Sequence, residues 1–279
     1  MRKKLFAVVA VLVIALTVVV PAGAITGGQP DGDMHPYSEL ILVPEVGFCS
    51  GTLISPTVVL TAGHCTDFFS DPEFDITQVY ITFDSEASVN LDTWAITGGT
   101  WYTATTWYTH PDYDADAWPY TADYGVVILD QAVTNITPAA LPEPYILDEI
   151  LGTTGQTDQR FMDVGYGQSG VNIGGGPPRG NFEFIRKYSI QRYNPSNGAV
   201  GTQYPLWLIL QDAPSANKGA GCGGDSGSGI FPEGEDTVVA VHVGGYRLGF
   251  QGQLCGRITS LNMRLDLPVV LDWLANFID

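Results

Sequence analysis

The stretch Gly221-Cys222-Gly223-Gly224-Asp225-Ser226-Gly227-Ser228-Gly229 decides the fold of this 279-residue chain. Glycines lie close to Ser226 on both sides, and glycine permits backbone dihedral angles that other residues resist. The serine is therefore predicted to lie on a tight turn with an unshielded hydroxyl. Peptide N–H groups around such a turn can converge on one point, which is what stabilising an oxyanion requires. The pattern also fits an ordinary turn, so its meaning depends on a base and an acid elsewhere.

Two further motifs supply those groups. Thr61-Ala62-Gly63-His64-Cys65 carries a histidine, and Thr121-Ala122-Asp123-Tyr124-Gly125 places an aspartate ahead of an apolar run. With these motifs in the chain order His, Asp, Ser, the sequence resembles the chymotrypsin-like (trypsin-fold) serine peptidases of secreted bacterial type. The resemblance implies an all-β fold of two antiparallel six-stranded Greek-key β-barrels with a C-terminal α-helix.

The resemblance also implies a role for each motif residue. Ser226 is the nucleophile, His64 the general base, and Asp123 the acid that orients His64. The backbone N–H groups of Gly224 and Ser226 form the oxyanion hole. The apolar strand after Asp123 favours this residue over three other acids nearby: Asp112, Asp114 and Asp116.

Residues 1–24 are predicted to be a secretory signal peptide. They have a basic start, an apolar run over residues 5–20 and the small-residue cleavage site Ala22-Gly23-Ala24. The run is shorter than the ~18–20 residues that span a bilayer, which argues against a membrane anchor. We expect a secreted, extracellular protein without membrane contact after signal removal. Residues 25–279 are then the peptidase domain, with the first barrel at about 25–150 and the second barrel plus the helix at about 151–279.

The segment Ile25-Thr26-Gly27-Gly28 resembles the N-terminus of activated family members. The resemblance implies that a free Ile25 α-amino group pairs with Asp225 and orders the oxyanion loop. No lysine or arginine lies between Lys4 and Arg160, so no trypsin-type site precedes Ile25. Our hypothesis is that signal peptidase itself creates the active N-terminus by cleaving after Ala24.

All four cysteines lie in the exported part, and an even count in an exported chain suggests disulfides. The resemblance implies the pairs Cys49–Cys65 and Cys222–Cys255, although Cys255 lies nearer the following strand than the usual family position. The spacing contains no Cys-x-x-Cys and the four histidines are scattered, so we expect no catalytic metal or other cofactor.

Charge divides the chain into two unlike halves. Residues 25–159 hold 20 acidic and no Lys or Arg side chains, whereas residues 160–279 hold ten acidic and nine basic ones. Such a field disfavours nucleic acid and anionic membranes as partners. Solubility is the preferred explanation, with saline adaptation and surface Ca²⁺ sites as alternatives. A monomer that acts on proteins or peptides is expected.

The resemblance places the substrate pocket at Ala220, His242, Gly244 and Gly256. Trypsin-like members carry an aspartate at the position of Ala220, so specificity for Arg or Lys is not expected. The two glycines leave room for apolar or aromatic side chains. His242 stands in a His-x-Gly-Gly setting like that of glutamate-specific members, which keeps acidic side chains as an alternative. A third interpretation is that His242 only forms hydrogen bonds near Asp123.

Short runs of β-branched and aromatic residues predict many strands. The first half has candidates at 40–43, 51–54, 57–60, 79–83 and 125–129, with a hairpin turn at Ser55-Pro56. The second half has candidates at 160–164, 182–190, 206–210 and 237–243. Apolar residues at 3.6-residue spacing predict a helix from 267 to 278, capped by Asp266 and packed, by resemblance, on the second barrel. His35 and His110 are expected at the surface.

The predicted function is a secreted serine endopeptidase that works through a His-Asp-Ser triad and an acyl-enzyme. A catalytically silent, peptidase-like binding module is the alternative from another class. Its signature would be a lost triad residue, and none is lost. An esterase with the same triad would have a different fold and chain order.

Overall fold

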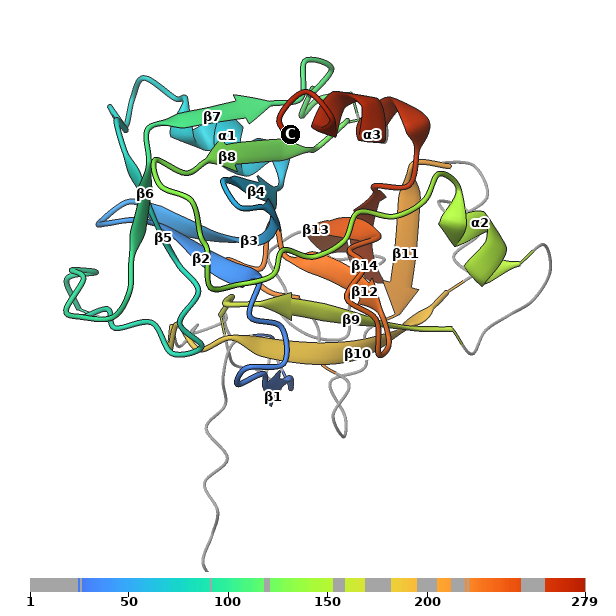
Figure 1. Cartoon of the computed structure of the whole chain (residues 1–279), viewed down its shortest axis with the longest axis horizontal. Helices are drawn as coiled ribbons and strands as arrows, with labels where there is room; N and C mark the ends of the chain where they lie inside the picture. Colours follow the sequence, from blue (N-terminus) through green and yellow to red (C-terminus); the bar gives the residue numbers. More distant parts are fainter. Residues whose placement is uncertain are drawn as a thin grey trace, which may run out of the picture.

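The fold is described by a computed structural model, which covers residues 25, 27–90, 92–117, 121–152, 159–168, 182–194, 205–211, 219, 221–246 and 259–278. Strands dominate, in two antiparallel sheets that lie side by side (Figure 1). Three helices occur among the described residues: α1 (Gly63–Phe69), α2 (Ile146–Leu151) and α3 (Pro268–Leu274).

The first sheet has the strand order β6-β5-β2-β3-β4-β8-β7. Its β6 and β7 are separated by Thr105 alone, and they pair with β5 and β8 respectively, which closes the sheet into a barrel. Counted as one bent strand, they make a six-stranded barrel. The strands are β2 (Ser38–Val43), β3 (Gly47–Ser55), β4 (Val58–Thr61), β5 (Val79–Thr82), β6 (Tyr102–Ala104), β7 (Thr106–Thr109) and β8 (Gly125–Ile128).

The second sheet has the order β1-β10-β11-β14-β13-β12-β9, and a further pairing of β9 with β10 closes it. Six strands form this barrel: β9 (Arg160–Gly165), β10 (Lys187–Tyr193), β11 (Trp207–Gln211), β12 (Gly229–Pro232), β13 (Ala240–Tyr246) and β14 (Thr259–Arg264). The two-residue β1 (Gln29–Pro30) adds to β10, so the N-terminal segment is bound to the second barrel.

The predicted all-β fold with two barrels and a C-terminal helix is confirmed. The hairpin of β3 and β4 turns after Ser55, as its Ser-Pro signal indicates, and α1 with His64 follows at once. The region predicted as one strand at 182–190 differs, because regular pairing begins only at Lys187. Before it, Ile185 forms an isolated bridge to Glu86 of the first half.

The predicted cap of the C-terminal helix is wrong. Helix α3 has Leu267 at its N-cap, without a side-chain cap. The Asp266 carboxylate instead accepts hydrogen bonds from Arg264 (2.8 and 2.9 Å) and from the Leu147 N–H at the start of α2 (2.9 Å). The segment after α3 reaches the first barrel, where the Phe277 ring lies 5.1 Å from that of Tyr108 in β7.

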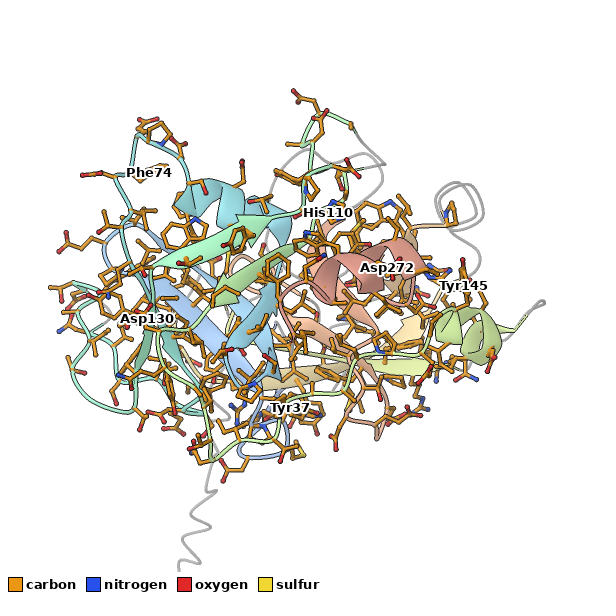
Figure 2. All side chains as sticks on the ribbon, turned by 45° about the horizontal axis from the view of Figure 1, so that its top comes forward. Tyr37, Phe74, His110, Asp130, Tyr145 and Asp272 are labelled. Carbon is orange, nitrogen blue, oxygen red and sulfur yellow. A yellow bond between two sulfur atoms is a disulfide. The ribbon has the colours of Figure 1, made fainter. Side chains whose placement is uncertain are left out.

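The expectation that His35 and His110 lie at the surface is also wrong, since both are buried. His110 lies between β7 and α3, with its ring 4.9 Å from that of Trp273 (Figure 2). His35 forms a hydrogen-bonded ion pair with Asp31 and stacks on Phe231. Both histidines fill the seams between elements that are distant in sequence.

A fully buried arginine joins the two barrels to the N-terminal segment. The Arg186 Nε donates to Asp31 Oδ2 at 2.9 Å. Its other nitrogens donate to the carbonyls of Gly32, Ser38 and Phe83, and to the Tyr166 hydroxyl. These partners lower the cost of burying the charge, because a buried ion is tolerated only when it is paired and hydrogen-bonded. Against the opposing effect of burial, the hydrogen bond with His35 and, to a smaller extent, the charge of Arg186 hold the pKa of Asp31 below its usual value.

Glu39 in β2 is another buried ionisable group, but its carboxylate has no hydrogen-bond or ion-pair partner among the described residues. It is 0% exposed, and neither of its carboxylate oxygens forms a hydrogen bond with the described residues. Burial raises the pKa of Glu39 well above its ordinary value, and nearby Arg186 opposes this only in part. The neutral carboxylic acid is therefore the form that suits the folded protein.

We predict that Glu39→Gln stabilises the protein more at pH 8 than at pH 5. A carboxyl with a raised folded pKa contributes stability below its unfolded pKa of about 4.3, and this is lost as the pH rises through the folded pKa. Glutamine does not ionise, so the thermal midpoint should rise at pH 8 and rise less at pH 5. Each kcal/mol of added stability corresponds to a rise of roughly 2–4 °C. The exposed Glu45→Gln is the control. An equal gain at both pH values would contradict the assignment.

Candidate active site

Strand pairing in the first barrel brings His64 and Asp123 together. Strands β4 and β8 pair with Thr61 opposite Gly125, so the residues just beyond Thr61 lie beside those just before Gly125. The His64 Nδ1 lies 3.0 Å from Asp123 Oδ2 and 3.2 Å from Oδ1. The backbone N–H of His64 also donates to Oδ1 at 2.7 Å. The carboxylate therefore orients the imidazole from two directions.

Exposure differs between the two side chains. The Asp123 side chain is 7% exposed, whereas that of His64 is 33% exposed. The aspartate is thus shielded from water, which strengthens its interaction with the imidazole. The histidine keeps a face open to an incoming substrate. Ala122, which precedes the aspartate, adopts a positive φ of 43°, a strained backbone conformation of the kind that gathers at functional sites.

The Ser226 loop of the second barrel lies against the His64 end of the first barrel. The Ser226 carbonyl accepts a hydrogen bond from the Ser50 N–H at 2.9 Å. The sulfur of Cys65, the residue after His64, lies 3.8 Å from the same carbonyl oxygen. Gly227 makes the approach possible, because a Cβ there would fall 2.0 Å from Thr61 Oγ1 and 2.2 Å from the Ser50 carbonyl oxygen.

Ser226 is half-buried, and its hydroxyl forms no hydrogen bond with any described residue. The structure therefore places the Ser226 loop beside His64 without a hydrogen bond from Ser226 Oγ to the imidazole. Hydrogen bonds between nucleophile and base are often long before substrate binds and tighten in the reacting complex. The observed arrangement is compatible with proton transfer between these two side chains.

Gly224 has the backbone conformation that an oxyanion loop of this shape requires. Its φ is +94°, in a region that favours glycine, and a Cβ there would fall 2.0 Å from the Phe48 ring. The Phe48 ring packs edge-on against Phe184, with centroids 5.0 Å apart. The aromatic contact therefore fixes the position of Gly224 from the first-barrel side.

Asp225 is buried, and within the described ranges its carboxylate accepts hydrogen bonds from backbone N–H groups alone. Its oxygens receive the N–H groups of Gly167 at 2.7 Å and Cys222 at 2.8 Å. Burial raises the pKa of Asp225 well above its usual value, and the nearby Asp163 acts in the same direction. No hydrogen bond or ion pair joins Asp225 to Ile25 among the described residues. In the whole chain the Ile25 nitrogen is part of a peptide bond to Ala24 and carries no charge.

His242 belongs to a buried polar network in the second barrel. Its Nδ1 lies 3.0 Å from Asn262 Oδ1 and 3.1 Å from Ser260 Oγ, and among the described residues no hydrogen bond joins His242 to Asp123. Asp163 Oδ2 is 3.8 Å away. Burial raises the pKa of Asp163, while His242 and a hydrogen bond from Ser228 oppose the rise. The sequence signal that could have predicted this network is the presence of polar residues within otherwise apolar strands of the second half.

Several predicted positions cannot be placed. Ala220, Cys255 and Gly256 lie outside the described residues. Gly244 is described, and a Cβ there would meet nothing within 4 Å, so the space beside it is open. The predicted Cys49–Cys65 disulfide is present, with a Cα–Cα distance of 6.5 Å. Cys222 is disulfide-bonded as well, but its pairing with Cys255 stays a prediction.

The described ranges contain no group of three or more His, Cys, Asp or Glu side chains arranged to hold a metal ion. None of the helices in the described part of the chain has the length and apolar character needed to cross a membrane.

Comparison with known proteins identifies the family. The sequence model of the family described as Trypsin matches residues 25–253. A curated relative named Trypsin, from Simulium vittatum, is 27% identical over 263 residues, covering 88% of this chain and 96% of the relative. A solved structure of HL collagenase superposes with a TM-score of 0.63 at 18% identity, covering 91% of this chain and 96% of that one. The structural likeness supports the fold, and the family match covers most of the sequence; the chain belongs to the trypsin family and is a serine-type endopeptidase.

Proposed function

We propose that this endopeptidase uses Ser226 as nucleophile, His64 as general base and Asp123 as the residue that orients His64. The observation that carries the proposal is the 3.0 Å contact between His64 Nδ1 and Asp123 Oδ2, with the Ser226 loop packed beside it. This contact commits Nδ1 to the carboxylate and leaves Nε2 to accept the serine proton. The alternative of a silent binding module is not favoured, because all three groups are present.

In the first step, Ser226 Oγ attacks the carbonyl carbon of the scissile peptide bond while His64 takes its proton. The peptide oxygen becomes an oxyanion, which the N–H groups of Gly224 and Ser226 stabilise. His64 then gives the proton to the leaving amine, and the C–N bond breaks to leave an acyl-enzyme. A water molecule, deprotonated by His64, attacks the acyl-enzyme and releases the new carboxyl end.

Ser226→Ala should abolish turnover and labelling by a fluorophosphonate probe, both measured on protein that begins at Ile25. A loss of about 10⁶-fold in kcat is expected, and His64→Ala should cost a similar amount because the triad acts as a unit. Asp123→Asn should cost about 10⁴-fold at pH 7, because it favours the wrong imidazole tautomer. Wild-type labelling at a serine other than Ser226 would overturn the assignment.

We further propose that the protein is secreted and that cleavage after Ala24 activates it. A free Ile25 α-amine would supply the cation that the buried Asp225 lacks in the whole chain. Two observations support this: Ile25 is fully buried, and the uncompensated carboxylate has a raised pKa. Pairing would stabilise the charged carboxylate and, through it, the loop that carries Gly224 and Ser226.

One extra residue before Ile25 should therefore abolish activity. N-terminal sequencing of exported protein should read Ile25-Thr26-Gly27-Gly28. The paired α-amine has a raised pKa, so activity should persist below its ordinary value of about 8 and fall as the pH rises through the folded value. Undiminished turnover by the extended form would show that the amine is not the switch.

Substrate choice is proposed to exclude Arg and Lys at the residue before the scissile bond, because Ala220 offers no carboxylate. The open space at Gly244 favours apolar or aromatic side chains. His242 is 2% exposed and its Nδ1 is already engaged, which supports a structural role for it. The alternative is recognition of an acidic side chain.

A peptide library that varies this residue should therefore show preferred cleavage after apolar or aromatic side chains. Cleavage after Arg and Lys should be lower by at least about tenfold, which corresponds to a single lost ion-pair partner. Preferred cleavage after Glu would instead favour the acidic alternative. Preferred cleavage after Arg would overturn the pocket assignment.

A further inference from the structure

Ser50 uses its backbone N–H and its hydroxyl to hold the Ser226 loop, the proposed nucleophile loop, against the first barrel. It lies in β3, directly after Cys49, and is 0% exposed. Its Oγ donates to the Gly224 carbonyl and its N–H donates to the Ser226 carbonyl, both at 2.9 Å. Two neighbours hold Ser50 in turn: the Tyr166 N–H donates to its Oγ at 2.9 Å, and Thr61 Oγ1 donates to its carbonyl at 2.8 Å.

The two carbonyls that Ser50 binds lie on either side of the peptide unit between Asp225 and Ser226. A peptide unit is planar, so fixing the direction of a carbonyl fixes the plane of that unit. The Gly224 carbonyl fixes the unit that ends at Asp225, and the Ser226 carbonyl fixes the unit that ends at Gly227. The unit between them, from Asp225 to Ser226, carries the Ser226 N–H. Its orientation is therefore constrained on both sides.

The Ser50 hydroxyl has a role that the Ser50 backbone cannot take over. The Ser226 carbonyl would keep its bond to the Ser50 N–H in any substitution except proline. The Gly224 carbonyl, however, has its bond from the hydroxyl, and the same hydroxyl accepts from Tyr166. A hydroxyl has one donor and two acceptor positions, which suits a group placed between a carbonyl and an N–H. Without it, two buried backbone groups lose their partners.

We propose that Ser50 is a positioning residue whose hydroxyl sets the geometry of the oxyanion hole from the opposite barrel. The inference rests on the proposed roles of Gly224 and Ser226. Removal of an entire oxyanion donor costs about 10²–10³ in kcat. Because Ser50 orients the donors without being one, its loss should cost less.

Ser50→Ala should lower kcat, and the second-order rate of fluorophosphonate labelling, by about 10- to 100-fold. The KM should stay within about threefold, because substrate binding does not use the oxyanion donors fully until the transition state. Rates are to be expressed per titrated active site, well below each thermal midpoint. Ser50→Thr keeps the hydroxyl and should recover most of both rates. Ser50→Gly also lacks the hydroxyl and gives an independent measure if Ser50→Ala does not fold.

Ser70→Ala is the matched control. Ser70 Oγ also donates to one carbonyl, that of Thr66 (2.9 Å), and accepts from one N–H, that of Trp107 (3.0 Å), but it does not touch the nucleophile loop. This variant should keep both rates. The inference is wrong if both hydroxyl-free Ser50 variants keep kcat within twofold, or if only KM changes. If Ser226→Ala stays active, the proposed site itself is wrong, and the two failures are thus distinguishable.

Discussion

The site depends on the close approach of two backbones from different barrels. Gly227 of the second barrel lies so near Thr61 and Ser50 of the first that a single added methyl group would overlap both. Only at this separation can the Ser226 carbonyl receive the Ser50 N–H and the loop lie beside Cys65. The first barrel supplies the proposed base and the acid that orients it, and the second supplies the proposed nucleophile. The contact at Gly227 therefore determines whether these groups can work together.

Several interactions keep the barrels at that distance. Ser50 bonds to the Ser226 loop, and the Cys49–Cys65 disulfide anchors the strand of Ser50 to helix α1, which carries His64. Arg186 bonds to Phe83 of the first half, to the Tyr166 hydroxyl of the second half and to Asp31. These groups are shielded from water. In such an environment hydrogen bonds and ion pairs are stronger, and breaking them costs more free energy. Rigid barrels joined in this way favour a catalytic arrangement that is formed before substrate arrives.

The sequence predicted what local patterns encode. The barrels followed from short β-branched strands and from the order of three motifs, and the hairpin after Ser55 followed from its turn residues. Partners distant in the chain left no such signal. Ser50 bonds to Gly224, 174 positions away, and Arg186 bonds to Asp31, 155 positions away. Asp266 has the residue type of a cap, but its carboxylate is taken by Arg264 and Leu147, which only tertiary contacts reveal. His35 was misplaced for the same reason, since its burial depends on the second barrel.

Arg186 also has a consequence for biosynthesis. Residues 25–159 contain no lysine or arginine, so the first barrel has no guanidinium or ammonium group of its own. The cation that pairs with Asp31 and bonds the carbonyls of Ser38 and Phe83 leaves the ribosome after the last strand of that barrel. A nascent first barrel therefore lacks this hydrogen-bond donor for the Ser38 and Phe83 carbonyls until Arg186 has been synthesised. Translation order makes the first half dependent on the second, and a chain interrupted before Arg186 should be recognised as unfinished by proteolysis or chaperones.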